Sequence, residues 1–208
     1  MGKENILQAK TWATDHLNMI MISELATEGI TNINVSAIMA GENVVATRDE
    51  VAKVIALYEA WQYLLEYYQS SWDVTFIKEL NNKCLKGQDK GSGVLRKVPV
   101  TVRNFSKQIP VISSKKFRDD VDWISKIANP EDKAVVMFCY IVQNQPFING
   151  NIITAQLIMN KILIENGIGT MWPPKEDINK FHLAIQLLFT DDAGPICEYL
   201  KQECIRRV

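Results

Sequence analysis

Apolar side chains recur along this chain mainly every three or four residues, which is the pattern of amphipathic helices. The pattern predicts helices over about residues 5–25, 47–68, 73–85, 119–127, 130–142, 151–166, 175–190 and 194–206. The helices at 130–142 and 151–166 are apolar on almost every side, so we expect both to lie at the centre of the fold.

Short local signals refine this picture. Thr47-Arg48-Asp49-Glu50 has the composition of a capping box at a helix start, and Gly29 suits a helix C-terminus. Residues 94–102 are rich in β-formers, but Pro99 lacks a backbone donor, so we expect one edge strand in a single hairpin at most. The predicted fold class is mainly α with one small β-hairpin.

The aromatic side chains between Tyr58 and Trp72 raise the question of a nucleic-acid partner, because aromatic rings can stack on bases. Their helical spacing is more typical of core and helix packing, and no run of Lys or Arg accompanies them. The whole chain of 208 residues has 23 basic and 24 acidic side chains, a formal net charge of −1. We therefore expect no nucleic-acid partner.

Histidines and cysteines limit the chemistry further. The two histidines, His16 and His182, are far apart, and the four cysteines form no C-x-x-C pair, so no metal site is predicted. We interpret the histidines as surface or boundary residues and the cysteines as reduced core thiols. No signal peptide or membrane-length apolar run is recognisable, and we expect a cytoplasmic protein without a membrane partner.

The segment between the two apolar helices reads Gln145-Pro146-Phe147-Ile148-Asn149-Gly150-Asn151. It resembles the signature H-P-F-x-[D/E]-G-N-G-R-x-x-R of the Fic family, which lies between the two central helices of an all-α fold. The resemblance covers roughly residues 33–172. It divides the chain into N-terminal helices (1–70), a Fic-like core (71–172) and C-terminal helices (173–208).

The resemblance implies an adenylyl-transfer site in which each motif residue has a role. The histidine is the general base for a target hydroxyl that attacks ATP, the acid holds Mg²⁺, and two arginines bind phosphates. This chain has Gln145 and Asn149 in place of the histidine and the acid, and Ile153 and Gln156 in place of the arginines. An amide does not titrate near neutral pH, and neutral side chains bind Mg²⁺ and phosphate weakly.

The turn that would form the family's anion hole is also altered. Ile152 replaces its second glycine, and a β-branched residue crowds a phosphate there. Gly150, Asn151 and Asn149 remain as a weak candidate for anion or nucleotide binding at a helix N-terminus.

Two other segments carry the resemblance. Residues 93–100 look like the family's hairpin flap, which holds a target protein in extended form, with docking residues Val94, Leu95, Arg96, Val98 and Val100. Glu42 lies in a segment similar to the family's inhibitory E-G-N-x-x-T, whose glutamate pairs with the second arginine. Here Glu42 would face Gln156, so that ion pair cannot form.

Two hypotheses about function remain. The first is a catalytically inactive Fic-fold protein that binds an unidentified protein partner and needs no cofactor. The second is a nucleotidyl (AMP) or related phosphate-group transferase with altered chemistry, which would still bind ATP and Mg²⁺. Five motif positions have changed together, and this favours the first hypothesis.

Overall fold

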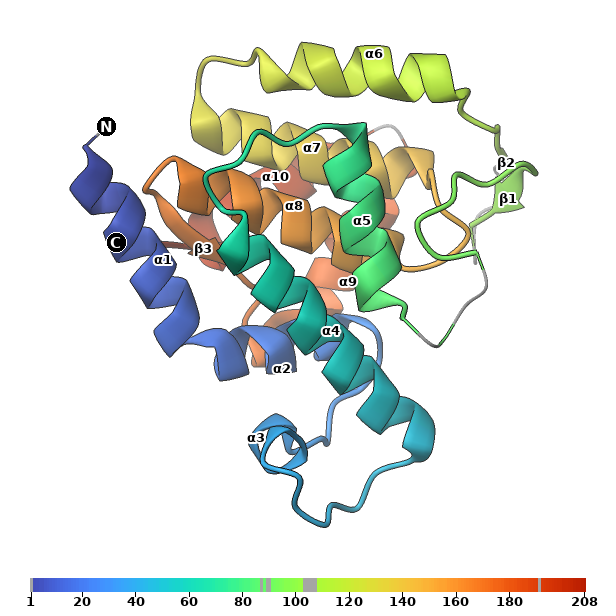
Figure 1. The fold of residues 1–208 in the computed structure, drawn as a ribbon. Helices are drawn as coiled ribbons and strands as arrows, with labels where there is room; N and C mark the ends of the chain where they lie inside the picture. Colours follow the sequence, from blue (N-terminus) through green and yellow to red (C-terminus); the bar gives the residue numbers. More distant parts are fainter. Residues whose placement is uncertain (1, 87, 89–90, 103–107, 191) are drawn as a thin grey trace.

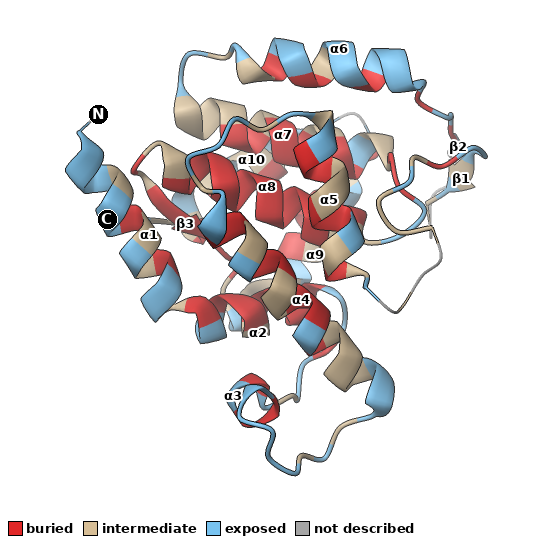
Figure 2. Ribbon diagram, in the orientation of Figure 1, coloured by how far each residue is buried: buried red, intermediate tan, exposed pale blue. Residues whose placement is uncertain are grey.

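The fold is built around two long helices, α7 (Pro130–Asn144) and α8 (Asn151–Glu165), which lie side by side (Figure 1). The computed structural model describes residues 2–86, 88, 91–102, 108–190 and 192–208. Buried residues cover almost every face of α8 and most of α7 (Figure 2). The predicted pair of central helices is therefore confirmed.

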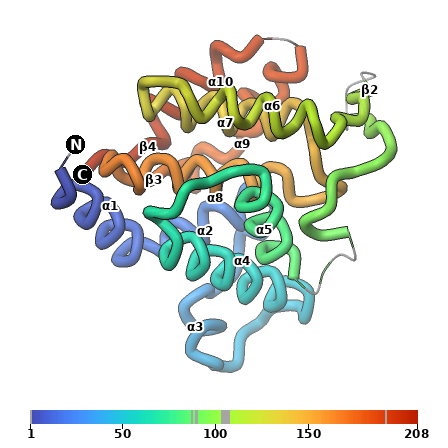
Figure 3. The backbone as a smooth tube through the Cα atoms, turned by 45° about the horizontal axis from the view of Figure 1, so that its top comes forward, coloured from blue at the N-terminus to red at the C-terminus, as the bar shows by residue number. Residues whose placement is uncertain are grey.

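The N-terminal half wraps one side of α8, and the C-terminal helices cover α7. In Figure 3, α8 runs between the N-terminal helices below it and α7 and α10 above it. The N-terminal helices are α1 (Lys3–Asp15), α2 (Leu17–Thr27), α3 (Val35–Met39), α4 (Arg48–Glu66) and α5 (Val74–Cys84). The others are α6 (Ser114–Ser125), the 3₁₀ turn η1 (Lys175–Asp177), α9 (Ile178–Leu188), α10 (Gly194–Tyr199) and the π-helical turn η2 (Leu200–Cys204).

The strands form two antiparallel pairs, so the mainly α fold with a small strand pair at the predicted flap is confirmed, and a second pair was not predicted. β1 (Val100–Thr101) pairs with β2 (Gln108–Ile109), and β3 (Gly169–Met171) pairs with β4 (Ile205–Arg207). The second pair shortens the helix predicted over 194–206. A Cβ on Gly169 would lie 1.9 Å from the Arg206 carbonyl oxygen, so a glycine lets the two strands approach. A contact between such distant segments leaves no trace in helical periodicity.

Two predicted helix boundaries also need correction. The helix expected over 5–25 breaks at His16, whose Nδ1 lies 2.9 Å from the Trp12 carbonyl oxygen and whose ring stacks on Trp12. α6 begins five residues earlier than the predicted 119, because the Ser113 hydroxyl caps it by accepting from the Lys116 amide at 3.1 Å.

Other local predictions are confirmed. Thr47 and Glu50 form a capping box, with bonds of 3.2 and 2.8 Å between each side chain and the other residue's amide. Gly29 has φ +84° beyond the end of α2, where the Ile30 amide bonds back to Leu25. Trp61, in the aromatic segment, is fully buried, as expected for helix packing.

A buried carboxyl joins α2, α4 and α8. Glu24 has no exposed surface, and it accepts hydrogen bonds from Trp61 Nε1 at 2.7 Å and Asn160 Nδ2 at 3.4 Å. Burial penalises the charged form and raises the pKa of Glu24 to about 8, although both hydrogen bonds oppose this rise. The carboxyl is therefore neutral at pH 7 in the folded chain.

The buried Glu24 carboxyl predicts a pH-dependent stability. In the folded chain this carboxyl keeps its proton up to about pH 8, whereas in the unfolded chain it loses the proton near pH 4.5. The Glu24 carboxyl therefore lowers the free energy of unfolding as the pH rises from about 4.5 to about 8. We expect Glu24→Gln to abolish this slope and to raise the free energy of unfolding at pH 8 by roughly 2–4 kcal/mol. Urea denaturation at several pH values measures it, with the exposed Glu4→Gln as control. Identical slopes in both variants would contradict the assignment.

Candidate functional site

The motif loop, residues 145–150, connects the two central helices through two left-handed residues. Gln145 ends α7 at φ 45° and ψ 57°, and Gly150 precedes α8 at φ 69°. A Cβ on Gly150 would lie 3.0 Å from the Leu85 Cδ1 atom, so α5's end packs directly against this turn. The glycine therefore serves both the reversal and the close packing.

Asn151 holds the loop closed with its side chain. Its Oδ1 accepts from the Phe147 amide, and its Nδ2 donates to the Phe147 carbonyl and to Gln145 Oε1, each at 3.0 Å. Gln145 Nε2 in turn donates to the Val142 carbonyl at 2.7 Å. Both polar atoms of the Gln145 amide are thus engaged inside the protein, and the residue offers no proton acceptor comparable to a histidine.

Arg96 fixes the loop from the other side. It is only 2% exposed, and its guanidinium donates to the carbonyls of Gln145 (2.6 Å), Val98 (2.6 Å), Pro110 (2.7 Å) and Asn144 (3.2 Å). Burial lowers the pKa of this guanidinium. Arg96 therefore ties both ends of the β1–β2 segment to the motif loop.

Most of the residues that were predicted to dock a target on the flap lie outside the strand pair. Of the five predicted docking residues, Val100 lies in the strand pair, while Val94, Leu95, Arg96 and Val98 precede it. Leu95 forms an isolated bridge with Phe147, and Arg96 is buried rather than presented to a target. The strands begin later than predicted because residues 95 and 96 pair with the motif loop instead.

A cavity of about 860 Å³ lies between the motif loop, β1, the end of α2 and α9; we call it the motif cavity. The residues that line it include Val100, Gln145, Ile152, His182 and Phe189. Among its described lining residues the titratable groups are Glu28 and His182, and none is Lys or Arg. His182 is half-buried, as predicted, but its Nε2 lies 2.9 Å from the Thr27 carbonyl, in the same cavity as Gln145. Sequence spacing gave no sign of that proximity.

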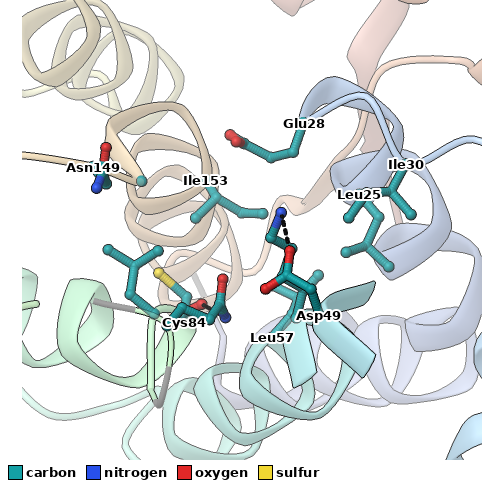
Figure 4. A pocket seen from close by; sticks show the side chains of 12 residues that line it. Leu25, Glu28, Ile30, Asp49, Leu57, Cys84, Asn149 and Ile153 are labelled. Carbon is teal, nitrogen blue, oxygen red and sulfur yellow. Dashed lines mark hydrogen bonds and ion pairs between the residues drawn. The ribbon is translucent and has the colours of Figure 1, made fainter. Parts of the chain in front are cut away.

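A second cavity, of about 360 Å³, lies on the other side of Glu28 and Asn149, which line both. Figure 4 shows Ile153 projecting into it, opposite the ion pair of Lys53 and Asp49 at 3.1 Å. Ile153 is buried. The position where the family resemblance places the first arginine is thus an apolar wall.

The acid beside the motif is Glu28, not Glu42. Glu42 is exposed in the turn after α3 and lines neither cavity. Glu28 is exposed at the end of α2, but desolvation by the surrounding protein raises the pKa of its carboxyl, while the charges of Lys53 and His182 lower it. A sequence signal existed: Glu28-Gly29 matches the first two letters of E-G-N-x-x-T, whereas Glu42 is followed by Asn43.

The Gln156 side chain points toward α2 and not toward Glu42. It is fully buried, and its Nε2 donates to the Thr27 hydroxyl at 2.9 Å. Its Oε1 is buried and has no hydrogen-bond partner within the described part of the chain. The second arginine position therefore contributes to the α2–α8 contact and not to a cavity surface.

The predicted anion turn is mostly used for structure. The Asn151 side chain is committed to the loop, and the Asn149 carbonyl accepts from Asn81 Nδ2 at 3.0 Å. Gly150 and the exposed Asn149 do line the second cavity. Within the described ranges, no group of three or more His, Cys, Asp or Glu side chains is placed to hold a metal ion.

Residues 71–163 match the model of the Fic/DOC family. This chain contains a Fic/DOC-family domain. Its sequence is similar to "Protein adenylyltransferase fic-1" of Caenorhabditis elegans, with 25% identity over 129 residues that cover 60% of this chain and 25% of that protein. The chain thus aligns with about a quarter of this curated relative's length.

Solved Fic structures share the fold. The chain superposes on Fic-1 (aa134–508) of C. elegans with a TM-score of 0.77 at 21% identity, covering 98% of this chain and 63% of that one. A Fic domain containing signaling protein of Bacteroides thetaiotaomicron gives 0.76 at 19%, covering 95% and 85%. IbpAFic2, solved covalently tethered to Cdc42, gives 0.56 at 20%, covering 89% and 62%.

Among the helices of the described residues, none is both long and apolar enough to cross a membrane.

The Arg96 clamp predicts a large stability loss on substitution. In Arg96→Met, four backbone carbonyls lose the donor of a buried side chain, and we expect the free energy of unfolding to fall by about 3 kcal/mol. Urea denaturation followed by circular dichroism measures this. The neighbouring Lys97 is exposed, so Lys97→Met removes a positive charge without touching the loop. Equal stability of the two variants would show that Arg96 does not hold the motif.

Proposed function

We propose that this chain is a Fic-fold protein that does not transfer nucleotides and that acts by binding another protein. The observation that carries the proposal is the Gln145 amide at the base position, with both of its polar atoms bonded to Asn151 and Val142. A group in that state neither titrates near neutral pH nor accepts a proton from a target hydroxyl.

The described residues do not fit a nucleoside triphosphate with Mg²⁺. Phosphate recognition needs cations or a cluster of free donors, but the motif cavity has no described Lys or Arg. In the second cavity Lys53 is paired with Asp49, and Ile153 forms the facing wall. Glu28 offers a phosphate no positive charge, and Asn149 adds no charge for a divalent ion. We therefore propose that the protein works without ATP or a metal cofactor.

The same cavity suits an apolar peptide segment. Val100, Ile152, Ile185 and Phe189 give it an apolar lining, and β1 runs along its rim. β1 pairs only with β2 among the described strands, so its other edge can accept an extended chain by strand addition. A related fold, that of IbpAFic2, has been solved tethered to a protein, Cdc42, which supports a protein as the partner here.

The absence of transfer is testable with ATP labelled at the α-phosphorus. We expect no labelled protein from the natural chain, from Gln145→His, from Glu28→Gly or from the double variant, because both motif arginine positions hold neutral side chains, Ile153 and Gln156, in all four. Autoradiography and intact mass measure the label, and calorimetry with ATP and Mg²⁺ measures binding.

Each arm of this experiment has a distinct meaning. Label in Glu28→Gly would show an active site blocked by one carboxylate, and label in Gln145→His would show that a single histidine suffices. Either result would replace the proposal with an altered nucleotidyl transferase.

The protein-binding part of the proposal predicts a localised effect. Val100→Asp places a charge at the rim of the motif cavity, and we expect it to abolish crosslinks to a partner at this cavity. Val45→Asp is the control, since Val45 is fully exposed and lines neither cavity. Quantitative crosslinking mass spectrometry in cells expressing the chain reads this out. Crosslinks that survive Val100→Asp at the natural level would exclude the cavity as the binding surface.

A further inference from the structure

Two cysteines from different helices meet away from the motif cavity. Cys139 lies in the middle of α7, Cys197 lies in α10, and their sulfur atoms are 3.8 Å apart. The sequence places Cys197 and Cys204 seven residues apart on one helix face, but the partner found for the Cys197 sulfur is Cys139. The four cysteines form no disulfide in this structure.

The two thiols of this pair differ in exposure. Cys139 is buried and Cys197 is half-exposed, so a small solute reaches Cys197 first. By contrast, Cys84 is buried and its sulfur contacts Asn81 and Thr154, and Cys204 has no exposed surface. Only the Cys139–Cys197 pair, among the cysteines, combines contact between sulfurs with access from solvent.

The surroundings also favour Cys197 as the thiolate. The two sulfurs are within hydrogen-bond distance of each other, and this contact and the nearby charge of Lys201 lower the pKa of Cys197 below its usual value, against the opposing effects of burial and Asp132. The same contact and the burial of the site raise the pKa of Cys139. The greater exposure of Cys197 and the direction of both shifts favour Cys197 as the nucleophile and Cys139 as the resolving thiol.

We propose that Cys139 and Cys197 form a reversible disulfide when the chain meets hydrogen peroxide. The Cys197 thiolate attacks one peroxide oxygen, the O–O bond breaks, and the released hydroxide takes a proton to give water and a Cys197 sulfenic acid. The Cys139 sulfur then displaces the second oxygen, which leaves with the Cys139 proton as a second water. Two thiols are oxidised and one peroxide is reduced. A small dithiol such as dithiothreitol reverses the step by exchange.

The two sulfurs are already in contact, and they need to approach by about 1.8 Å to reach disulfide length. Two ion pairs already join the C-terminal segment to the start of α7: Lys201 pairs with Asp132 at 2.5 Å, and Arg207 pairs with Glu131 at 2.8 Å. The disulfide would therefore fasten the C-terminal helices to α7, the helix that ends at Gln145, across a sequence separation of 58 residues.

Peptide mapping of the full chain tests the proposal. After treatment with equimolar peroxide and alkylation with N-ethylmaleimide, we expect an intramolecular disulfide joining the peptides of Cys139 and Cys197. The thermal midpoint should rise by roughly 5–10 °C and return with dithiothreitol. Cys84→Ser and Cys204→Ser should behave like the natural chain.

Variants of the pair separate the two roles. Cys139→Ser should accumulate a Cys197 sulfenic acid that dimedone labels, and Cys197→Ser should give neither label nor disulfide. If the natural chain instead gives dimedone-labelled Cys197 with no disulfide, or disulfides only between molecules, the proposal is overturned. Because the mapping uses the natural chain, it does not depend on how the variants fold.

Discussion

Helix α8 is buried on nearly every face although its sequence is not wholly apolar, and the rest of the fold depends on satisfying its polar side chains. Each buried polar side chain on α8 bonds to a different part of the structure: Asn151 to the motif loop, Thr154 to Asn81 of α5, the Gln156 Nε2 to Thr27 of α2, Asn160 to the backbone of Met171 in β3, and Lys161 to the Ser70 carbonyl after α4. A buried polar group without a partner costs about 1–3 kcal/mol. The set of bonds therefore fixes where these elements sit around α8.

The same constraint explains the character of the candidate site. In this Fic/DOC domain, positions that would serve phosphate chemistry by resemblance are occupied by side chains that serve packing: Gln156 and Asn151 in hydrogen bonds, Ile153 in an apolar wall. Arg96 has likewise become a clamp on backbone carbonyls. A framework held together by so many contacts keeps its shape without the charged motif residues, which is consistent with the proposed role in binding.

Local rules predicted the elements that depend on neighbouring residues. The capping box at Thr47, the glycine after α2 and the two apolar helices all follow from short-range geometry and periodicity. The strand pair β3–β4, the placement of Leu95 and Arg96 against the motif loop, and Glu28 as the acid at the cavity were missed. Each of these depends on a contact between segments far apart in the chain.

The amino-acid sequence by itself determined the mainly helical fold class, the position of the motif loop and the loss of its titratable and charged groups, because residue type and local spacing decide these. Only the tertiary structure decided which side chains share a cavity and which thiols touch: His182 with Gln145, and Cys139 with Cys197. The physical reason is that burial and pairing depend on how distant helices pack around α8, and no local pattern encodes that packing.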